Sequence, residues 1–388
     1  MSYLTQEALD QLSAIRQDIH TYPEIAYEEK RTAGIVANYL RQCHVDEVHE
    51  NVGGYGVVGI INGKKPGKSI ALRADMDALA IQEVVPQGEE RPHCSVIPNR
   101  FHGCGHDGHT AMLLGAAKYL AEQRNFAGRV VLIFQPGEEN LSGAAEMLKD
   151  GLMTRFPFEE VYGVHNTFDL PLGHITINDG PALSALDNFT INIKGNGSHG
   201  ATPHLSIDPI MIAAKLITDL QTIVSRNVPP LQSAVLSLGA IEGGTTFNVI
   251  PDLVQLKGCL RSYNDDVRQL LKTRMQALVK ATEIGFNCQI ALNFVLSCPA
   301  VINDTTLAMS VYNGIKKQMG ADNVNLSVVP QTPSEDFAFY LQHAKGVYGF
   351  IGINTAKPVH HPEYDFNDKV IPFGVAFWAS VVQARLPL

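Results

Sequence analysis

The chain is organised around the stretch FHGCGHDGHT, residues 101–110, in which three histidines, a cysteine and an aspartate stand among three glycines. The glycines let the backbone curl, so that Cys104 and His106 can point toward one place. A thiolate and an imidazole are good ligands for a divalent cation such as zinc. The apolar spacing over residues 112–120 predicts a helix that begins near Asp107, and a helix N-terminus favours the thiolate. The stretch predicts a metal site at a helix start; the structural alternative is a polar turn with a buried cysteine.

Length and composition favour a globular protein with a small-molecule substrate. At 388 residues the chain exceeds what one hydrophobic core usually supports, so we expect about two domains. Hydrophobic residues make up 45% and charged residues 18%, which is typical of a soluble globular protein. The net charge of -9 argues against nucleic acid or an anionic membrane as a partner, because neither would attract it.

The compartment is predicted from what the sequence lacks. The start, MSYLTQE, has neither the basic nor the apolar region of a signal peptide, and no apolar run is long enough to span a bilayer. Six sparse cysteines show no pairing pattern, which suits a reducing environment. We therefore expect a cytoplasmic protein.

Three apolar runs with the pattern of buried strands lead into polar residues of the kind that bind metals. They are 69–73 with Asp75 and Asp77, 129–134 with Glu138 and Glu139, and 160–164 with His165 and Asn166. A parallel sheet brings the carboxyl ends of its strands to one edge, where α/β proteins bind ligands. Taken singly, the aspartates could be turn residues and the glutamates a solvated surface turn. The recurrence favours a shared site.

Individual roles follow from the chemistry of these side chains. Asp77 could orient a metal-binding imidazole. Glu138 and Glu139 are adjacent and point in different directions, so one could bind a metal while the other moves protons. His20 is interpreted as a packing or capping histidine.

Residues 187–296 have the pattern of an inserted second domain. Polar and apolar residues alternate over 188–194, as in a half-exposed antiparallel strand. The elements that follow give the order β-α-β-β-α-β of a split ferredoxin-like unit: helix 210–224, strands 233–241 and 254–261, helix 265–282 and strand 287–295. The loop 195–204 is rich in glycine and has His199 at its middle.

The remaining chain alternates helix and strand around the insertion. A strand at 56–61 precedes the run 69–73, and residues 62–67 between them read as a hairpin-like or crossover turn. His360 and His361 follow a strand at 346–353. Helices are expected at 7–20, 28–40, 306–319 and 371–384, and one more opens at 333–341, with acids in its first turn.

Motifs along nearly the whole chain resemble those of the amidohydrolase branch of the aminoacylase/carboxypeptidase metallohydrolase family. Besides residues 102–109, they are Gly137-Glu138-Glu139, Val164-His165-Asn166, Ser198-His199-Gly200, TFNVIP at 246–251, Ser334-Glu335-Asp336-Phe337 and His360-His361-Pro362. The branch includes hippurate hydrolases, N-acyl-amino-acid amidohydrolases, indole-acetyl-amino-acid hydrolases and N-acetyldiaminopimelate deacetylases. The resemblance implies an α/β catalytic domain, residues 1–186 and 297–388, with a dinuclear metal site, and a ferredoxin-like lid domain, 187–296, that mediates homodimerisation.

The resemblance also implies residue roles. Two divalent ions, of Zn, Mn, Co or Ni, would be held by five side chains: Cys104, His106, Glu139, His165 and His360, with Cys104 as bridging ligand. The spacing to the proline selects His360 over His361. Glu138 would be the general base and Asp77 the orienting carboxylate. On the lid, His199, Asn248 and Arg261 would contact the substrate, with His199 acting within one chain or across a dimer.

The implied function is hydrolysis of the amide bond of an N-acyl-L-amino acid to a carboxylate and a free amino acid, by a metal-bridged water that Glu138 activates. Two other enzymatic hypotheses stay open: a dipeptidase or carboxypeptidase, and a dedicated N-acetyldiaminopimelate deacetylase. The non-enzymatic hypothesis is a catalytically silent metal-binding regulator. It is disfavoured because the base and all five ligands are present.

Overall fold

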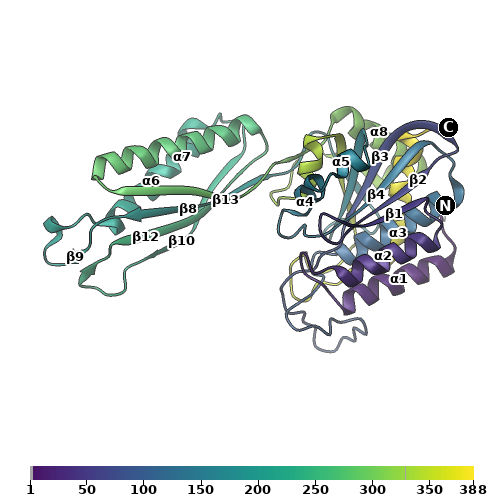
Figure 1. Cartoon of the computed structure of the whole chain (residues 1–388), viewed down its shortest axis with the longest axis horizontal. Coiled ribbons are helices and arrows are strands. Elements are labelled where there is room, and N and C mark those ends of the chain that lie inside the picture. Colours follow the sequence, from purple (N-terminus) through teal and green to yellow (C-terminus); the bar gives the residue numbers. More distant parts are fainter. Residues whose placement is uncertain (1–2, 328) are drawn as a thin grey trace. The chain divides into compact units, whose positions relative to one another are not determined.

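Residues 3–327 and 329–388 are described in the computed structural model, and the chain packs into two units (Figure 1). The first unit takes in Met1–Ala182, Ile302–Pro330 and Asp336–Leu388. The second takes in Leu183–Val301 and also the short segment Gln331–Glu335. The second unit therefore includes a segment from far along the chain as well as the expected insertion.

A mixed eight-stranded sheet forms the centre of the first unit, in the order β1-β2-β4-β3-β5-β16-β6-β15. β3 is parallel to both of its neighbours, β4 and β5, and β5 is parallel to β16. The mixed α/β fold predicted from the sequence is confirmed. The strands are β1 (Glu47–Val52), β2 (Gly56–Asn62), β3 (Lys65–Asp75), β4 (Ala127–Gln135), β5 (Glu160–Thr167), β6 (Ile175–Asn178), β15 (Val324–Ser327) and β16 (Lys345–Gly352).

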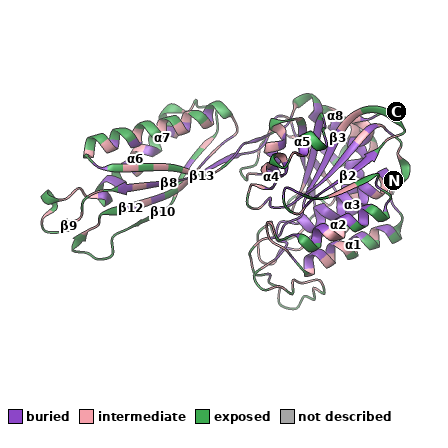
Figure 2. Cartoon of the chain, viewed as in Figure 1, coloured by how far each residue is buried: buried purple, intermediate pink, exposed green. Residues whose placement is uncertain are grey.

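The turn between β2 and β3 is a crossover and not a hairpin, because β4 lies between these strands in the sheet. β2 pairs antiparallel with β4, whereas β3 pairs parallel with it. The apolar runs of these strands are buried, which places them in the interior of the sheet (Figure 2). A buried Val/Ile run does not reveal which neighbour it pairs with.

Helix α3 (His106–Gln123) is largely buried and packs against α1 (Gln6–Thr21) and α9 (Ile371–Arg385).

Within the described ranges, no helix has the length and apolar character needed to cross a membrane. The other helices of this unit are α2 (Lys30–Gln42), α4 (Gly143–Lys149), α5 (Leu152–Arg155), α8 (Thr305–Met319) and the 3₁₀ turns η2 (Ala321–Asn323), η3 (Asp336–Gln342) and η4 (Asp368–Val370).

The helix expected over residues 333–341 is wrong, since only the 3₁₀ turn η3 forms there. Asp336 was expected to stabilise the first turn of that helix. Instead its carboxylate is buried and accepts hydrogen bonds from Arg73, Gln135 and the backbone N–H of Ala144. These tertiary contacts outweigh the local helical tendency.

The second unit has the ferredoxin-like arrangement expected from the order of its elements. Its antiparallel sheet has the order β10-β12-β8-β13, and α6 and α7 pack on it through a common apolar core. Its elements are β8 (Ala185–Lys194), β9 (Ser198–His199), η1 (Pro203–Leu205), α6 (Pro209–Asn227), β10 (Ala234–Gly243), β11 (Val249–Ile250), β12 (Leu253–Ser262), α7 (Asp265–Phe286) and β13 (Gln289–Cys298). The short strands β7 (Pro181–Leu183) and β14 (Val301–Ile302) each span a boundary between the units along the chain.

Glu160, at the start of β5, can be used to test how much one charged side chain contributes to the stability of this fold. Its carboxylate accepts hydrogen bonds from Arg385 at 2.8 and 3.0 Å and from the Tyr162 hydroxyl at 2.6 Å, and it pairs with Lys68. Burial opposes its charge, but the bonds from Arg385, and then from Lys68 and Tyr162, lower the pKa of Glu160 to about 2. The ionised Glu160 side chain therefore stabilises the folded protein at pH values above its pKa in the unfolded chain. This stabilisation is lost as the pH falls toward 2.

We expect Glu160→Gln to lower the free energy of unfolding at pH 7 by about 1.5–3 kcal/mol, the usual range for hydrogen bonds to a charged group. The difference from the unsubstituted protein should shrink as pH falls from about 4.5 to about 2. Urea unfolding at several pH values measures it. Glu159→Gln, at the exposed neighbouring position, is the control. A pH-independent difference would contradict the ionic origin of the effect.

Candidate metal centre

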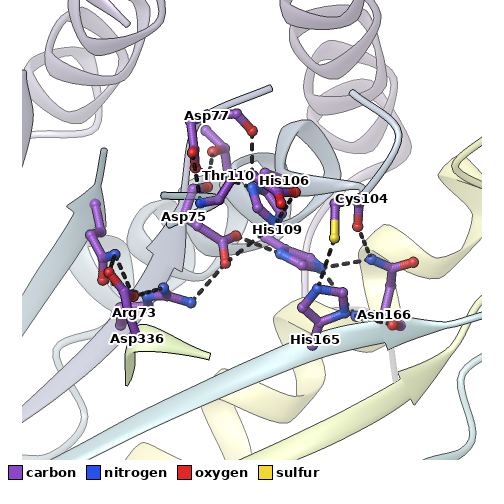
Figure 3. Close-up of polar contacts among 12 residues, drawn as sticks. Arg73, Asp75, Asp77, Cys104, His106, His109, Thr110, His165, Asn166 and Asp336 are labelled. Atoms are coloured by element: carbon purple, nitrogen blue, oxygen red, sulfur yellow. Dashed lines mark hydrogen bonds and ion pairs between the residues drawn. The ribbon is translucent and has the colours of Figure 1, made fainter. Parts of the chain in front are cut away.

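The candidate site lies where the central strands of the first unit end (Figure 3). In the sheet register Asp75 at the end of β3 lies opposite Gln135 at the end of β4, and Arg73 lies opposite Gly163 of β5. The residues beyond these positions are therefore brought to one edge, as the sequence predicted. His165 departs from that prediction in one respect, because it lies inside β5 and not after it.

Gly105 allows Cys104 and His106 to face the same place. It has φ +88, a left-handed conformation that L side chains rarely adopt. A Cβ at this position would lie 2.5 Å from Asn166 Nδ2 and 2.6 Å from the Tyr364 hydroxyl. The backbone thus enters α3 by a route that only glycine permits.

The five predicted ligands come together as two groups of three that share Cys104. In one group the ligand atoms of Cys104, His106 and His165 all lie within 4.8 Å of one another, and in the other those of Cys104, Glu139 and His360 do. Cys104 Sγ lies 3.4 Å from His165 Nε2 and 3.3 Å from His360 Nε2. His106 also groups with Glu138 and Glu139, so the two sets adjoin.

Hydrogen bonds set the tautomers of two of these imidazoles. His106 Nδ1 lies 2.9 Å from the backbone oxygen of Asp77, and His165 Nδ1 lies 2.7 Å from that of Asn166. A carbonyl oxygen only accepts, so each Nδ1 carries a proton, and in the neutral imidazole Nε2 is then the nitrogen with the lone pair. Both Nε2 atoms are therefore able to bind a cation, and the bond from the opposite nitrogen fixes the ring.

Unpartnered polar atoms indicate that the donor set fits a cation. His106 Nε2 and Glu139 Oε1 are buried and make no hydrogen bond within the described part of the chain. Burial, and then the charge of Glu139, raises the pKa of the Cys104 thiol. The hydrogen bond with Cys104, and then the close approach of the Glu139 carboxylate, raise the pKa of His360 to about 10. A thiol, a carboxylate and imidazoles arranged in this way match the ligands of zinc and of other divalent transition metals.

The Asp77 carboxylate connects two of these ligands. Its Oδ1 lies 3.3 Å from His106 Nδ1, and its Oδ2 accepts the backbone N–H of Glu139 at 2.9 Å. Burial raises the pKa of Asp77, although the contact with His106 opposes this shift. One side chain thus orients an imidazole and holds the turn that carries both glutamates.

The sequence interpretation assigned no role to His109, which the structure places behind the site. Its Nε2 accepts the backbone N–H of Asn166 at 3.0 Å, so its Nδ1 carries the proton that Asp75 accepts at 2.6 Å. Arg73 in turn donates to Asp75 at 2.7 Å. Because His109 stands three residues after His106 on α3, helical spacing was the signal that could have placed both on one face. This chain of bonds ties α3 to β5 beside His165.

His360 and His361 differ in their surroundings. His360 Nε2 lies 3.5 Å from Glu139 Oε1, and its backbone N–H donates to the oxygen of Gly103 at 2.7 Å. His361 Nδ1 instead accepts the backbone N–H of Glu363 at 3.1 Å. The structure therefore brings His360, and not His361, to Cys104 and Glu139.

The predicted substrate residues of the second unit fall into two places. β9, with His199, pairs with β11, and the N–H of Gly200 donates to the oxygen of Asn248 at 2.8 Å. His199 and Asn248 are exposed, so they lie close together on the surface of this unit. Arg261 lies near the far end of β12 and donates to the oxygen of Thr332 at 2.8 Å. The structure does not bring Arg261 to the other two.

A mixed-sheet domain with clustered cation ligands, interrupted by a ferredoxin-like unit, is the architecture of a two-domain metallohydrolase. The chain belongs to peptidase family M20/M25/M40, whose family model matches residues 71–384. The family recognised from the sequence motifs is thereby confirmed, and with it the class of hydrolase that acts on carbon–nitrogen bonds.

Curated and solved relatives agree with this assignment. The chain is 37% identical to a hippurate hydrolase of Campylobacter jejuni, over 97% of this chain and 98% of that protein. It is 38% identical to an N-acetyl-L-cysteine deacetylase of Bacillus subtilis, over 93% of this chain and 85% of the relative. A Bacillus subtilis crystal structure described as a dinuclear metal-binding peptidase from family M20 is similar with a TM-score of 0.85 and 29% identity, over 97% of this chain and 98% of that one.

Proposed function

We propose that this chain hydrolyses the amide bond of N-acyl-L-amino acids, with N-acetyl and N-benzoyl compounds as the first substrates to examine. The observation that carries the proposal is the pair of ligand groups that share Cys104, with the buried Glu138 beside them. The names of two relatives, a hippurate hydrolase and an N-acetyl-L-cysteine deacetylase, support the same substrate class.

The ligands proposed for two divalent ions are Cys104, His106, Glu139, His165 and His360, with Cys104 shared between them. Zinc suits this donor set, and manganese, cobalt and nickel are the other candidates. When bound, the ions lower the pKa of a water and polarise the scissile carbonyl.

Glu138 is the proposed general base. Its carboxylate takes a proton from the attacking water and gives it to the nitrogen of the leaving amine, so the carbon–nitrogen bond breaks without releasing an amide anion. Its place in a group with His106 and Glu139 supports this role. Asp77 orients His106 and the turn that carries Glu138, through the two contacts of its carboxylate.

Residues 187–296 are proposed to form a lid domain that also mediates homodimerisation. His199 would donate a hydrogen bond to the oxyanion that forms as water attacks, and Asn248 and Arg261 would bind the substrate. The exposure of His199 and Asn248 on adjoining segments supports a shared role. We further propose a cytoplasmic enzyme whose partners include neither nucleic acid nor a membrane, in keeping with its net charge of -9.

The test of substrate class is a hydrolysis panel with the purified, metal-loaded protein. It comprises N-acetyl, N-benzoyl and indole-acetyl amino acids, dipeptides and N-acetyldiaminopimelate, with amine release as the readout. Preferred cleavage of the simple N-acyl amino acids is expected. Preference for dipeptides would replace the proposal with a dipeptidase, and cleavage of N-acetyldiaminopimelate alone would replace it with a dedicated deacetylase.

We expect Glu138→Gln to lower kcat by about 10²–10⁴-fold, the usual contribution of general acid–base catalysis, and to leave metal content unchanged. The amide matches the carboxylate in shape but is a poor proton acceptor. Steady-state kinetics together with elemental analysis measures both quantities. Near-normal turnover by this variant would remove Glu138 from the role of base.

Cys104→Ala should lower metal retention at both positions, because Cys104 belongs to both ligand groups. His165→Ala and His360→Ala should each lower it at one position, by about one ion per chain. Elemental analysis after dialysis against a weak chelator measures the ions retained. His361→Ala is the control for His360→Ala. If Cys104→Ala retained as much metal as the unsubstituted protein, Cys104 would be a packing residue.

His199→Ala should lower kcat by about 10²–10³-fold with metal content unchanged, as expected for the loss of an oxyanion donor. His204→Ala, an exposed histidine five residues further along, is the control. Mixing the His199→Ala and Glu138→Gln proteins should restore activity if the imidazole acts across a dimer, and should not if it acts within one chain. Unchanged kcat in His199→Ala would refute the role in either form.

A further inference from the structure

The turn that carries Glu138 and Glu139 is contacted by a glutamate from far along the chain. Glu29, the N-cap residue of α2, is fully buried, and its Oε1 accepts the backbone N–H of Gly137 at 2.8 Å. Gly137 is the residue directly before Glu138, so this bond holds the Pro136–Gly137 peptide at the entry to the residue that carries the proposed base. The two partners are separated by 108 positions, so only the tertiary fold brings them together.

Tyr27 and Gly137 make this contact sterically specific. Gly137 has φ +65, and a Cβ there would lie 3.0 Å from the Tyr27 ring. The Tyr27 hydroxyl lies 2.8 Å from Ser142 Oγ at the other end of the same turn. The segment 27–29 therefore packs on the turn with an aromatic ring and bonds it with a carboxylate.

Two other buried carboxylates hold the same turn, each through a different N–H group. Asp77 Oδ2 accepts the N–H of Glu139, and Asp336 Oδ2 accepts that of Ala144, both at 2.9 Å. Asp77 also orients His106, and Asp336 also pairs with Arg73. Glu29 differs from them, because its second oxygen, Oε2, is buried and makes no hydrogen bond to any residue that the structure describes. Glu29 is bonded to this turn through the N–H of Gly137.

Burying the carboxyl group of Glu29 at this position costs free energy. Burial, and then the nearby negative charge of Asp77, raises the pKa of Glu29 to about 7. An apolar residue of similar size would avoid the desolvation of Oε2 and could still pack against Tyr27. What it could not do is accept the Gly137 N–H, which would then be buried and unpaired.

We infer that Glu29 is a positioning residue, which sets the direction of the Glu138 carboxylate by holding the Gly137 N–H. The inference rests on the proposed role of Glu138 as base. Within residues 3–327 and 329–388, no hydrogen bond or ion pair joins Glu29 to the proposed cation ligands, so its effect reaches the reaction through the backbone of the turn. A misplacement of a reacting group by about 1 Å can cost on the order of a hundredfold in rate.

The experiment compares Glu29→Met, which keeps the size of the side chain but removes the acceptor, with Glu29→Gln, which retains an acceptor oxygen. Glu28→Gln, at the exposed neighbouring position, is the control. Glu29→Met should lower kcat by about 10- to 100-fold, with KM within about twofold and metal content unchanged. Glu29→Gln should restore most of the lost kcat. If the Glu29→Met protein fails to fold, Glu29→Asp takes its place. Its side chain is one methylene shorter, so its carboxylate should no longer reach the Gly137 N–H, and kcat should fall by a similar factor.

Hydrogen exchange of the peptide 136–143 without substrate provides a readout that does not depend on activity. Exchange at this turn should be faster in Glu29→Met and near normal in Glu29→Gln. Unchanged kcat in Glu29→Met or Glu29→Asp would overturn the inference. Loss of metal in parallel with kcat would also overturn it, and so would a kcat of Glu29→Gln as low as that of Glu29→Met. Altered exchange in a protein that hydrolyses no member of the panel would uphold the contact and refute the proposed function.

Discussion

The carboxylate of Asp77 joins the two chain segments that supply much of the candidate metal centre. One oxygen lies 3.3 Å from the imidazole of His106 at the start of α3, and the other accepts the N–H of Glu139 after β4. Asp77 can reach both because β3 pairs with β4 and α3 packs against β3. The strand order thus determines which side chains meet. A different neighbour for β3 would leave the same motifs in the sequence but separate them in space.

The sheet was predictable where burial alone determines a strand, and less so where the partner does. The Val/Ile-rich runs of β2, β4 and β5 mark buried strands in any α/β protein. The pairing of β2 with β4, which makes residues 62–67 a crossover, depends on a partner that the run does not specify. The helix expected over 333–341 failed for a related reason: Asp336 bonds to Arg73 and Gln135, and local sequence carries no trace of such distant partners.

The residues of the candidate site also differ in how far the sequence alone could identify them. Candidate ligands could be named from the sequence, because a cysteine and a histidine two residues apart stand out by composition, and the full set of five was implied by the resemblance to a known family. The residues that hold them were harder to identify. Glu29 reads as an ordinary charged residue at a helix start, and His109 as one more histidine of the motif. Their roles depend on the bonds to Gly137 and Asn166, and these become visible only when the chain has folded.

Buried negative charge links the cations to the fold itself. Burial raises the pKa of both Asp77 and Cys104, and the charge of Glu139 adds to this in each case, while His106 lowers both. The negative groups therefore oppose one another's ionisation. Cations at this edge would relieve that repulsion and keep the ligands charged, which makes part of their binding free energy available to stabilise the folded state. The turn carrying Glu138 adjoins these charges, and its backbone N–H groups are held by carboxylates of the same sign. Asp77, which contacts both His106 and the N–H of Glu139, therefore contributes both to the arrangement of the proposed ligands and to the position of the turn that carries Glu138.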